Sequence, residues 1–225
     1  MRLLASALAA CLAAVSAPHA RADDTQLWTL YSVNGQLPGA SNWTYMANTE
    51  LRFAGNASEL STSILRAGLT YKTRSGLSLG GGVLRSYNGG LFTDGRENRL
   101  WQEASYTLLD LGEPSLTGRT RFEQRMQDAG GETGWRLRQR IRYTRPLPHP
   151  DLSLAITNEV FWSLNGTAWG QDAGFDQNRL GAAITWKTGS NVNLEAGYTF
   201  IAIDGEDQLI DETRNIFQFS LSLAL

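Results

Sequence analysis

Residues 134–145 read Gly-Trp-Arg-Leu-Arg-Gln-Arg-Ile-Arg-Tyr-Thr-Arg, and residues 119–125 read Arg-Thr-Arg-Phe-Glu-Gln-Arg. In both stretches a charged residue occupies nearly every second position. Successive side chains of a β-strand point to opposite faces, so this period of two gathers the charges on one face and mostly apolar or aromatic groups on the other. The two stretches therefore predict neighbouring strands with a basic face and an apolar face.

The same alternation continues through the chain, and no helical period of comparable strength competes with it. The expected strands span 43–54, 61–73, 76–87, 98–109, 116–127, 134–145, 152–163, 176–187, 192–203 and 215–225. An earlier apolar stretch, 27–33, reads as a further strand or as a segment inside the fold. The sequence therefore predicts an all-β protein.

The connections between these strands alternate in length. Short ones, such as 73–75 and 188–191, follow longer or more polar ones, such as 88–97 and 165–175. Short turns at one end and long loops at the other are typical of bacterial outer-membrane barrels. No later stretch of the chain approaches the ~20 consecutive apolar residues of a membrane helix.

The N-terminus predicts export. Arg2 precedes an apolar run over 3–17 and the small-residue site Ala20-Arg21-Ala22, so residues 1–22 read as a secretory signal peptide. A lipoprotein box ending at Cys11 is the less favoured alternative, because the apolar stretch before it is short. Cys11 is the single cysteine, so we expect the exported chain to have no disulfide and no thiol chemistry.

Alternation alone fits two barrels, which differ in the face that looks inward. In a soluble barrel the apolar face is the core; in a membrane barrel it contacts lipid and the arginines line the lumen. Export, alternating loop lengths, aromatic residues near strand ends and an alternating final strand favour the membrane. We therefore predict an antiparallel transmembrane up-and-down β-barrel of about ten strands (10–12) over 43–225, with 23–42 as an accessory strand or lumen insert. Eleven antiparallel strands would not close an ordinary barrel.

In the membrane barrel, the positions that face the lumen follow from the alternation. The basic ladder consists of Arg119, Arg121, Arg125, Arg136, Arg138, Arg140 and Arg142. Its expected acidic partners are Glu103, Glu123 and Glu159. An arginine facing lipid at mid-membrane would cost about 2–4 kcal/mol, so the ladder must face inward. Because arginines outnumber carboxylates there, the lumen is expected to carry net positive charge.

Catalysis finds little support in the sequence. The exported chain has one histidine, His149, within the proline-rich turn 146–150, so no Ser-His-Asp set can be assembled. Carboxylates among arginines have lowered pKa values and make poor general acids. We expect no catalytic residues, no metal, no cofactor and no nucleic-acid partner. The arginines serve either as structural salt bridges or as a binding path for small anions, to which the guanidinium fork is suited.

The chain resembles a bacterial family of outer-membrane proteins known as domain of unknown function 2490. The resemblance covers nearly the whole exported chain. It rests on Leu27-Trp28, Thr49-Glu-Leu-Arg-Phe53, Leu69-Thr-Tyr-Lys72, Gly76-Leu-Ser-Leu-Gly-Gly-Gly82, Arg121-Phe-Glu-Gln-Arg125, Arg138-Gln-Arg-Ile-Arg-Tyr143, Asn158-Glu-Val-Phe161 and Gln177-Asn-Arg-Leu-Gly181. It implies a barrel in the outer membrane and no particular reaction.

The sequence thus favours an outer-membrane β-barrel of a Gram-negative bacterium, with a salt-bridged lumen that is structural or narrowly permeable to anions. Its expected partners are outer-membrane lipid, small anions and the barrel-assembly machinery, because the final strand resembles the terminal signal of outer-membrane proteins. Two alternatives stay open. One is an outer-membrane enzyme acting on lipid or envelope polymer, and the other is a soluble periplasmic β-barrel binding protein.

Overall fold

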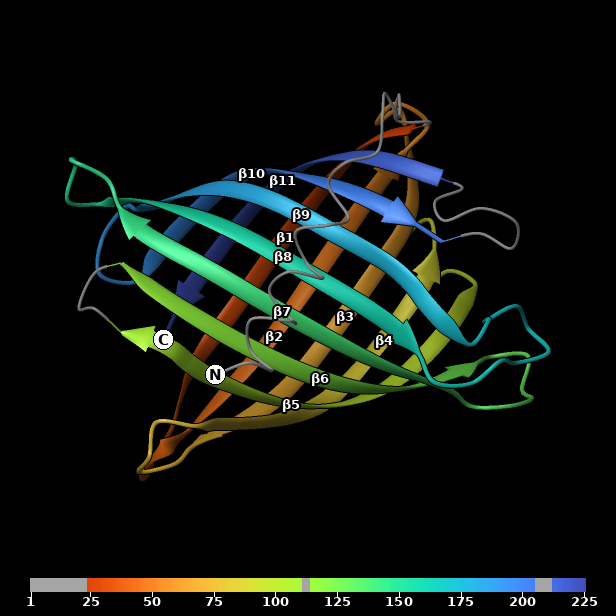
Figure 1. The fold of residues 1–225 in the computed structure, drawn as a ribbon, viewed down its shortest axis with the longest axis horizontal. Helices are drawn as coiled ribbons and strands as arrows, with labels where there is room; N and C mark the ends of the chain where they lie inside the picture. Colours follow the sequence, from red (N-terminus) through yellow and green to blue (C-terminus); the bar gives the residue numbers. More distant parts are fainter. Residues whose placement is uncertain (1–23, 111–113, 205–211) are drawn as a thin grey trace, which may run out of the picture.

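The computed structural model describes residues 24–110, 114–204 and 212–225, so the predicted signal peptide lies outside the described residues. The described residues form one continuous sheet (Figure 1). Its strands are β1 (Asp24–Leu37), β2 (Ala40–Ala54), β3 (Glu59–Lys72), β4 (Ser78–Asn88), β5 (Gly95–Asp110), β6 (Ser115–Gln127), β7 (Gly134–Pro146), β8 (Leu152–Ser163), β9 (Gly174–Lys187), β10 (Val192–Ile203) and β11 (Glu212–Ala224). No helix in these ranges is both long and apolar enough to cross a membrane.

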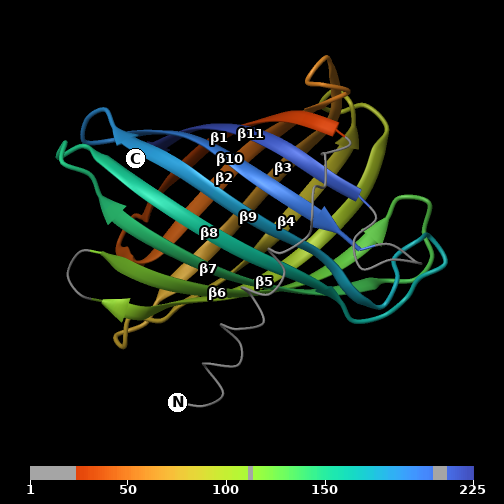
Figure 2. The same ribbon diagram turned by 45° about the horizontal axis from the view of Figure 1, so that its top comes forward.

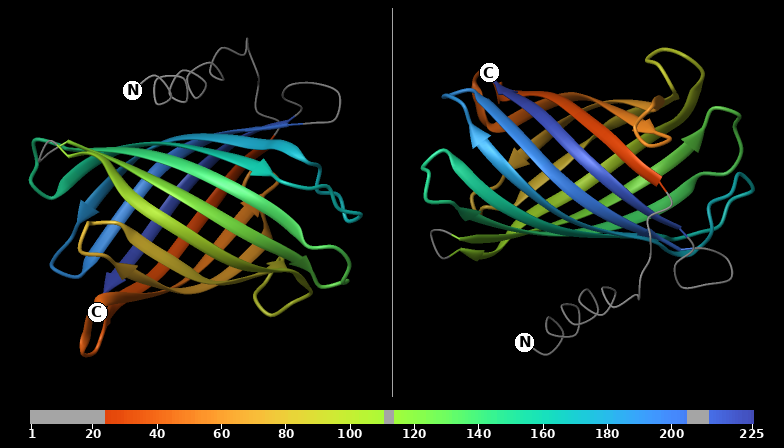
Figure 3. Two further views of the ribbon diagram at one scale, coloured as in Figure 1. Left: turned by 60° about the horizontal axis from the view of Figure 1, so that its bottom comes forward. Right: turned by 90° about the horizontal axis from the view of Figure 1, so that it is seen from above.

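The sheet closes on itself as a barrel. Each strand pairs antiparallel with the next one in the sequence, and β1 pairs with β11 to complete the ring. This last pair is parallel, with Asp24 opposite Arg214 at one end and Asn34 opposite Ala224 at the other. The two strands lie side by side in Figures 2 and 3. An odd number of strands that alternate in direction leaves the first and last pointing the same way, so closure requires one parallel pair.

This closure corrects two expectations. The central estimate of ten strands is one too few, and the barrel is mixed rather than wholly antiparallel. The segment 23–42 is neither an accessory strand nor a lumen insert, because Asp24–Leu37 forms a full strand of the wall. The barrel therefore begins at Asp24 and not at residue 43, and eleven strands close because β1 joins β11 in parallel.

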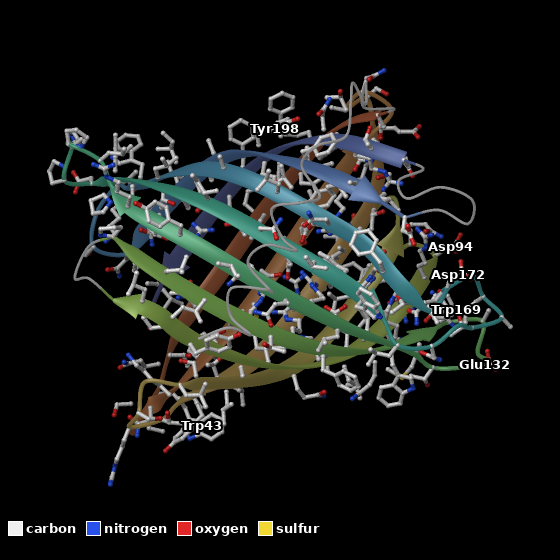
Figure 4. The ribbon with its side chains drawn as sticks, in the orientation of Figure 1. Trp43, Asp94, Glu132, Trp169, Asp172 and Tyr198 are labelled. Atoms are coloured by element: carbon white, nitrogen blue, oxygen red, sulfur yellow. The ribbon has the colours of Figure 1, made fainter. Side chains whose placement is uncertain are left out.

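The connections divide between the two ends of the barrel. At the short-turn end, strands are joined by residues 38–39, 73–77, 147–151 and 188–191; β5 and β11 also finish there, and β6 begins there. At the loop end, they are joined by residues 55–58, 89–94, 128–133 and 164–173; β10 finishes there and β11 begins there. Figure 4 shows Trp43 at the short-turn end and Asp94, Glu132, Trp169 and Asp172 at the opposite, loop end.

The outer wall is apolar and the inner wall polar. More than twenty large apolar side chains are at least a third exposed, among them Leu69, Val83, Ile156 and Phe219. Buried polar or charged residues outnumber buried apolar ones, and Glu123 is only 1% exposed. A soluble domain shows the opposite distribution. An apolar surface this extensive marks contact with lipid or protein.

Two apolar clusters form parts of the inner wall. The first contains Trp28, Ile201 and Ile216, and the second contains Ile64, Leu84 and Trp101. The Trp101 ring lies against Gly68 and Gly82, its neighbours along the same row of strand pairs. A Cβ at Gly68 or Gly82 would come within 2.4 or 2.6 Å of the Trp101 ring, so only glycine leaves room for the indole at these positions. These clusters fill part of the lumen, and the arginines line the space that the clusters leave open.

Candidate functional site

The structure places all seven residues of the predicted basic ladder on the inner wall of β6 and β7. Arg119 lies opposite Arg140, and Arg121 lies opposite Arg138, so the two ladders interlock across the strand pair. Like charges at this spacing repel, and such an arrangement persists only with counter-charges between them. Carboxylates on β5, β6 and β8 supply those counter-charges.

Glu123 is the most buried of these carboxylates. It accepts hydrogen bonds from Arg136 Nη2 at 2.7 Å and from Arg138 Nη1 at 2.7 Å, one on each carboxylate oxygen. Arg99 and Arg121 approach within 3.8 and 4.0 Å. One carboxylate thus compensates guanidinium groups from three strands, and it ties β5, β6 and β7 together inside the barrel.

Glu159 and Glu103 bridge the remaining ladder residues. Glu159 accepts from Arg119 Nη2 at 2.6 Å and from Arg138 Nη2 at 3.0 Å. Glu103 accepts from Arg121 through Nε at 2.8 Å and Nη2 at 2.6 Å. The structure therefore brings the three predicted carboxylates together with the ladder, and Arg138 joins two of them.

Glu97 is a lumen carboxylate at a position where the sequence predicts the end of a loop. It is 3% exposed and pairs with Arg99 and with Arg125, whose Nε lies 2.7 Å from Glu97 Oε1. β5 begins at Gly95, earlier than expected, and so includes this residue. The sequence does contain a signal for this inward position: Glu97 lies two residues before Arg99, and the same alternation continues through Trp101 and Glu103.

Aromatic rings hold several guanidinium groups in place. The guanidinium carbon of Arg138 lies 4.3 Å from the Phe161 ring centroid, and that of Arg179 lies 4.4 Å from it. Arg52 and Arg179 also approach the Trp28 ring, at 3.8 and 5.1 Å. Each such contact stabilises the cation by about 0.5–2 kcal/mol. Trp28 belongs to β1, a segment that the sequence pattern leaves open as a strand or an insert, so the contacts of this ring in the lumen are not predictable from the pattern.

A cavity of about 800 Å³ occupies the lumen. Twelve arginines line it against four glutamates, and neither lysine nor aspartate contributes to the lining. Guanidinium groups are permanently charged and bind carboxylate or phosphate through two parallel N–H donors. The cavity wall is therefore electropositive and rich in donors suited to oxyanions.

The connection 164–173 folds over the cavity at the loop end. Trp169 and Gly170 belong to the cavity lining. Trp169 Nε1 donates to the Glu132 carbonyl at 2.8 Å, and the buried Gln171 accepts from Arg125 Nη1 at 3.0 Å. The loop is thus anchored both to the neighbouring 128–133 connection and to the ladder, and Trp169 lies near Glu132 at the loop end (Figure 4).

His149 lies far from the ladder, in the β7–β8 turn at the short-turn end. Its side chain is 60% exposed, and its Nδ1 lies 3.9 Å from Asp151 Oδ2. Arg142, the ladder residue nearest this end along β7, donates to Glu195 Oε2 at 2.8 Å. The structure does not bring His149 to any of the lumen carboxylates.

These features define a closed β-barrel with an apolar outer wall and an arginine-rich, salt-bridged lumen. A sequence model of the family described as "Protein of unknown function (DUF2490)" matches residues 25–209, so the chain belongs to this family and the resemblance is confirmed. An uncharacterized protein of Methylorubrum extorquens is 32% identical over 200 residues, which cover 88% of this chain and 86% of that protein.

The chain also aligns with a solved structure. The anion-selective porin from Comamonas acidovorans superposes with a TM-score of 0.37 at 10% sequence identity. The alignment covers 80% of this chain and 55% of the porin, so the chain spans about half the length of that structure.

Proposed function

We propose that the protein is an outer-membrane β-barrel whose lumen admits small anions. The observation that carries this proposal is the cavity of about 800 Å³ with twelve arginines and four glutamates in its wall. A constriction lined by arginine repels cations and attracts anions. The salt bridges fix the arginines in place, and the excess of positive charge over negative charge in the cavity wall supplies the anion selectivity.

The outer wall supports the membrane part of the proposal. Leu, Val, Ile and Phe side chains are exposed on it. Aromatic pairs lie near both ends: Trp43 and Tyr71 have centroids 5.1 Å apart at the short-turn end, and Phe122 and Trp135 lie 5.4 Å apart toward the loop end. Aromatic girdles at the two interfaces around an apolar band characterise outer-membrane barrels. Outer-membrane lipid and the barrel-assembly machinery are then its partners during insertion.

The narrowness of the barrel limits what passes. Eleven strands enclose an interior that side chains largely fill, and Trp28 and Trp101 occupy part of it. We therefore propose a low-conductance path for ions and small solutes, with no catalytic step. The lumen carboxylates already accept hydrogen bonds from arginines, which leaves them poorly placed to donate protons.

Planar-bilayer recording of the purified protein under a potassium chloride gradient tests the function. We expect small single-channel currents whose reversal potential has the sign of chloride selectivity. Two results would refute anion permeation. One is a cation-selective current, and the other is no current from folded protein, which is recognised by faster migration on a gel when unheated than when heated. Recovery from the periplasm without detergent would refute the membrane assignment and favour a soluble barrel.

A further inference from the structure

Arg140, Glu159 and Arg179 form one row across the inner wall. Arg140 lies opposite Glu159 in the β7–β8 pair, and Glu159 lies opposite Arg179 in the β8–β9 pair. Directly opposed residues have Cα atoms about 4.5–5.5 Å apart, so the two arginines flank the carboxylate with about 10 Å between their own Cα atoms. All three side chains line the cavity.

The carboxylate in this row is bound to other arginines. Glu159 is 7% exposed, and both of its oxygens accept from residues outside the row: Oε1 from Arg119 at 2.6 Å and Oε2 from Arg138 at 3.0 Å. Within the described residues, neither Arg140 nor Arg179 has a carboxylate oxygen within 4.0 Å. The row therefore holds two guanidinium groups whose charge no ion pair neutralises.

The donors of these two arginines are available to the cavity. Arg179 uses only Nε, which donates to Gln177 Oε1 at 2.8 Å, and the guanidinium of Arg140 makes no hydrogen bond with any described residue. None of their nitrogens is among the fully buried atoms that lack a partner, so the free N–H groups face cavity space. Leaving charged N–H donors without a hydrogen-bond acceptor is costly, so a ligand or water in the cavity is their natural partner.

Arg179 is also held in position before any ligand arrives. Its guanidinium carbon lies 4.4 Å from the Phe161 centroid and 5.1 Å from the Trp28 centroid. A side chain fixed by two rings loses little conformational freedom on binding, so more of the interaction energy appears as affinity. The Nη groups of Arg179 thus form a preorganised fork.

The cavity also contains carboxylates that would repel an anion, and their own ion pairs limit this effect. Glu50 Oε1 lies 2.7 Å from Arg52 Nε, and Glu195 Oε2 lies 2.8 Å from Arg142 Nη2. With twelve arginines against four glutamates in the lining, the net field favours an anion.

We propose that Arg140 and Arg179 form a binding site for a small oxyanion of the phosphate class within the lumen. Two guanidinium forks match the several charged oxygens of phosphate, whereas chloride offers a single point of attachment. The inference rests on the proposed function, because the ligand reaches the site through the lumen. It goes further in assigning a saturable site and a ligand class to a particular row of residues.

Calorimetric titration of the folded protein in detergent with inorganic phosphate tests the site. We expect saturable binding that weakens at least tenfold in Arg140→Gln and in Arg179→Gln. Arg96→Gln is the matched control: it removes the same charge from the same cavity at the exposed loop-end mouth, and we expect its affinity to stay within about threefold of the parent, as screening in open solvent implies. Arg179→Lys keeps the charge but loses the two parallel N–H donors of the guanidinium. Its affinity for phosphate should therefore lie between that of the parent and that of Arg179→Gln.

A second measurement separates the site from the function. Phosphate added to an open channel should reduce the chloride current of the parent and of Arg96→Gln, and reduce it less in Arg179→Gln. Equal weakening in all glutamine variants would show a diffuse field and overturn the site, as would the absence of phosphate binding. Anion-selective current without phosphate block refutes only the site. Phosphate binding that depends on Arg179, in protein that carries no current, refutes only permeation.

Discussion

Replacing Glu123 with glutamine should destabilise the barrel strongly. The carboxylate is 1% exposed and accepts three hydrogen bonds, two from Arg136 and one from Arg138. Glutamine has the same shape and keeps one acceptor oxygen, but it removes the negative charge and places an amide donor against a guanidinium. Breaking a buried ion pair from one side costs about 3–5 kcal/mol, because the remaining charges stay buried without compensation. We expect a loss of that size in the free energy of unfolding.

Equilibrium unfolding by guanidinium chloride in detergent, followed by tryptophan fluorescence, measures this loss. Glu195→Gln is the matched control in the same lumen, since Glu195 is 30% exposed in its side chain and has one arginine partner, Arg142, which is 28% exposed. Exposed pairs contribute about 0–1 kcal/mol, so the control should change little. A loss below ~1 kcal/mol for Glu123→Gln, or equal losses for both variants, would refute the view that buried ion pairs hold the strands together.

Three further outcomes follow from the structure. Gly82→Ala should destabilise the barrel by about 1–3 kcal/mol, because its Cβ would come within 2.1 Å of the Ala67 carbonyl oxygen and 2.6 Å of the Trp101 ring; an unchanged unfolding midpoint would contradict the packing. Cysteines at Tyr31 and Leu221, which are paired in the parallel β1–β11 register, should be joined by a short bifunctional maleimide in folded protein. A cysteine pair offset by four residues along β11 should react much less, and equal reaction of both pairs would contradict the closure. Trp169→Ala should raise single-channel conductance, because the ring lines the cavity beside the loop-end opening; an unchanged conductance would place the narrowest point elsewhere.

The gathering of the basic ladder on one face of the sheet was predictable from the strand alternation, whereas its inward direction also rested on the export signal, the loop lengths and the aromatic residues near strand ends. Arg136, Arg138 and Arg140 alternate with Leu137 and Gln139, and the pleat of a strand turns that local period into two faces without reference to the rest of the chain. The excess of arginine over glutamate in the lumen follows from the same alternation. Strand boundaries were less certain, and for this reason Glu97 was assigned to a loop.

The pairing of particular charges could not be predicted. Arg138 bridges Glu123 and Glu159, whereas Arg140, its neighbour on the same face, has neither. Which guanidinium meets which carboxylate depends on the register between strands distant in the sequence and on how long side chains share the lumen. Alternation along one strand contains no information about that choice.

The sequence by itself determined that the chain is a β-protein whose strands each have one charged and one apolar face, because that property is local to each strand. Only the tertiary structure decided that Asp24–Leu37 is a wall strand and that eleven strands close through one parallel pair. It also decided that Trp28 and Phe161 meet Arg179. The physical reason is that barrel closure brings together residues far apart in the sequence. Ser32 and Ser222, for example, are 190 positions apart and share a hydrogen bond between their hydroxyl groups. No local period encodes such a meeting.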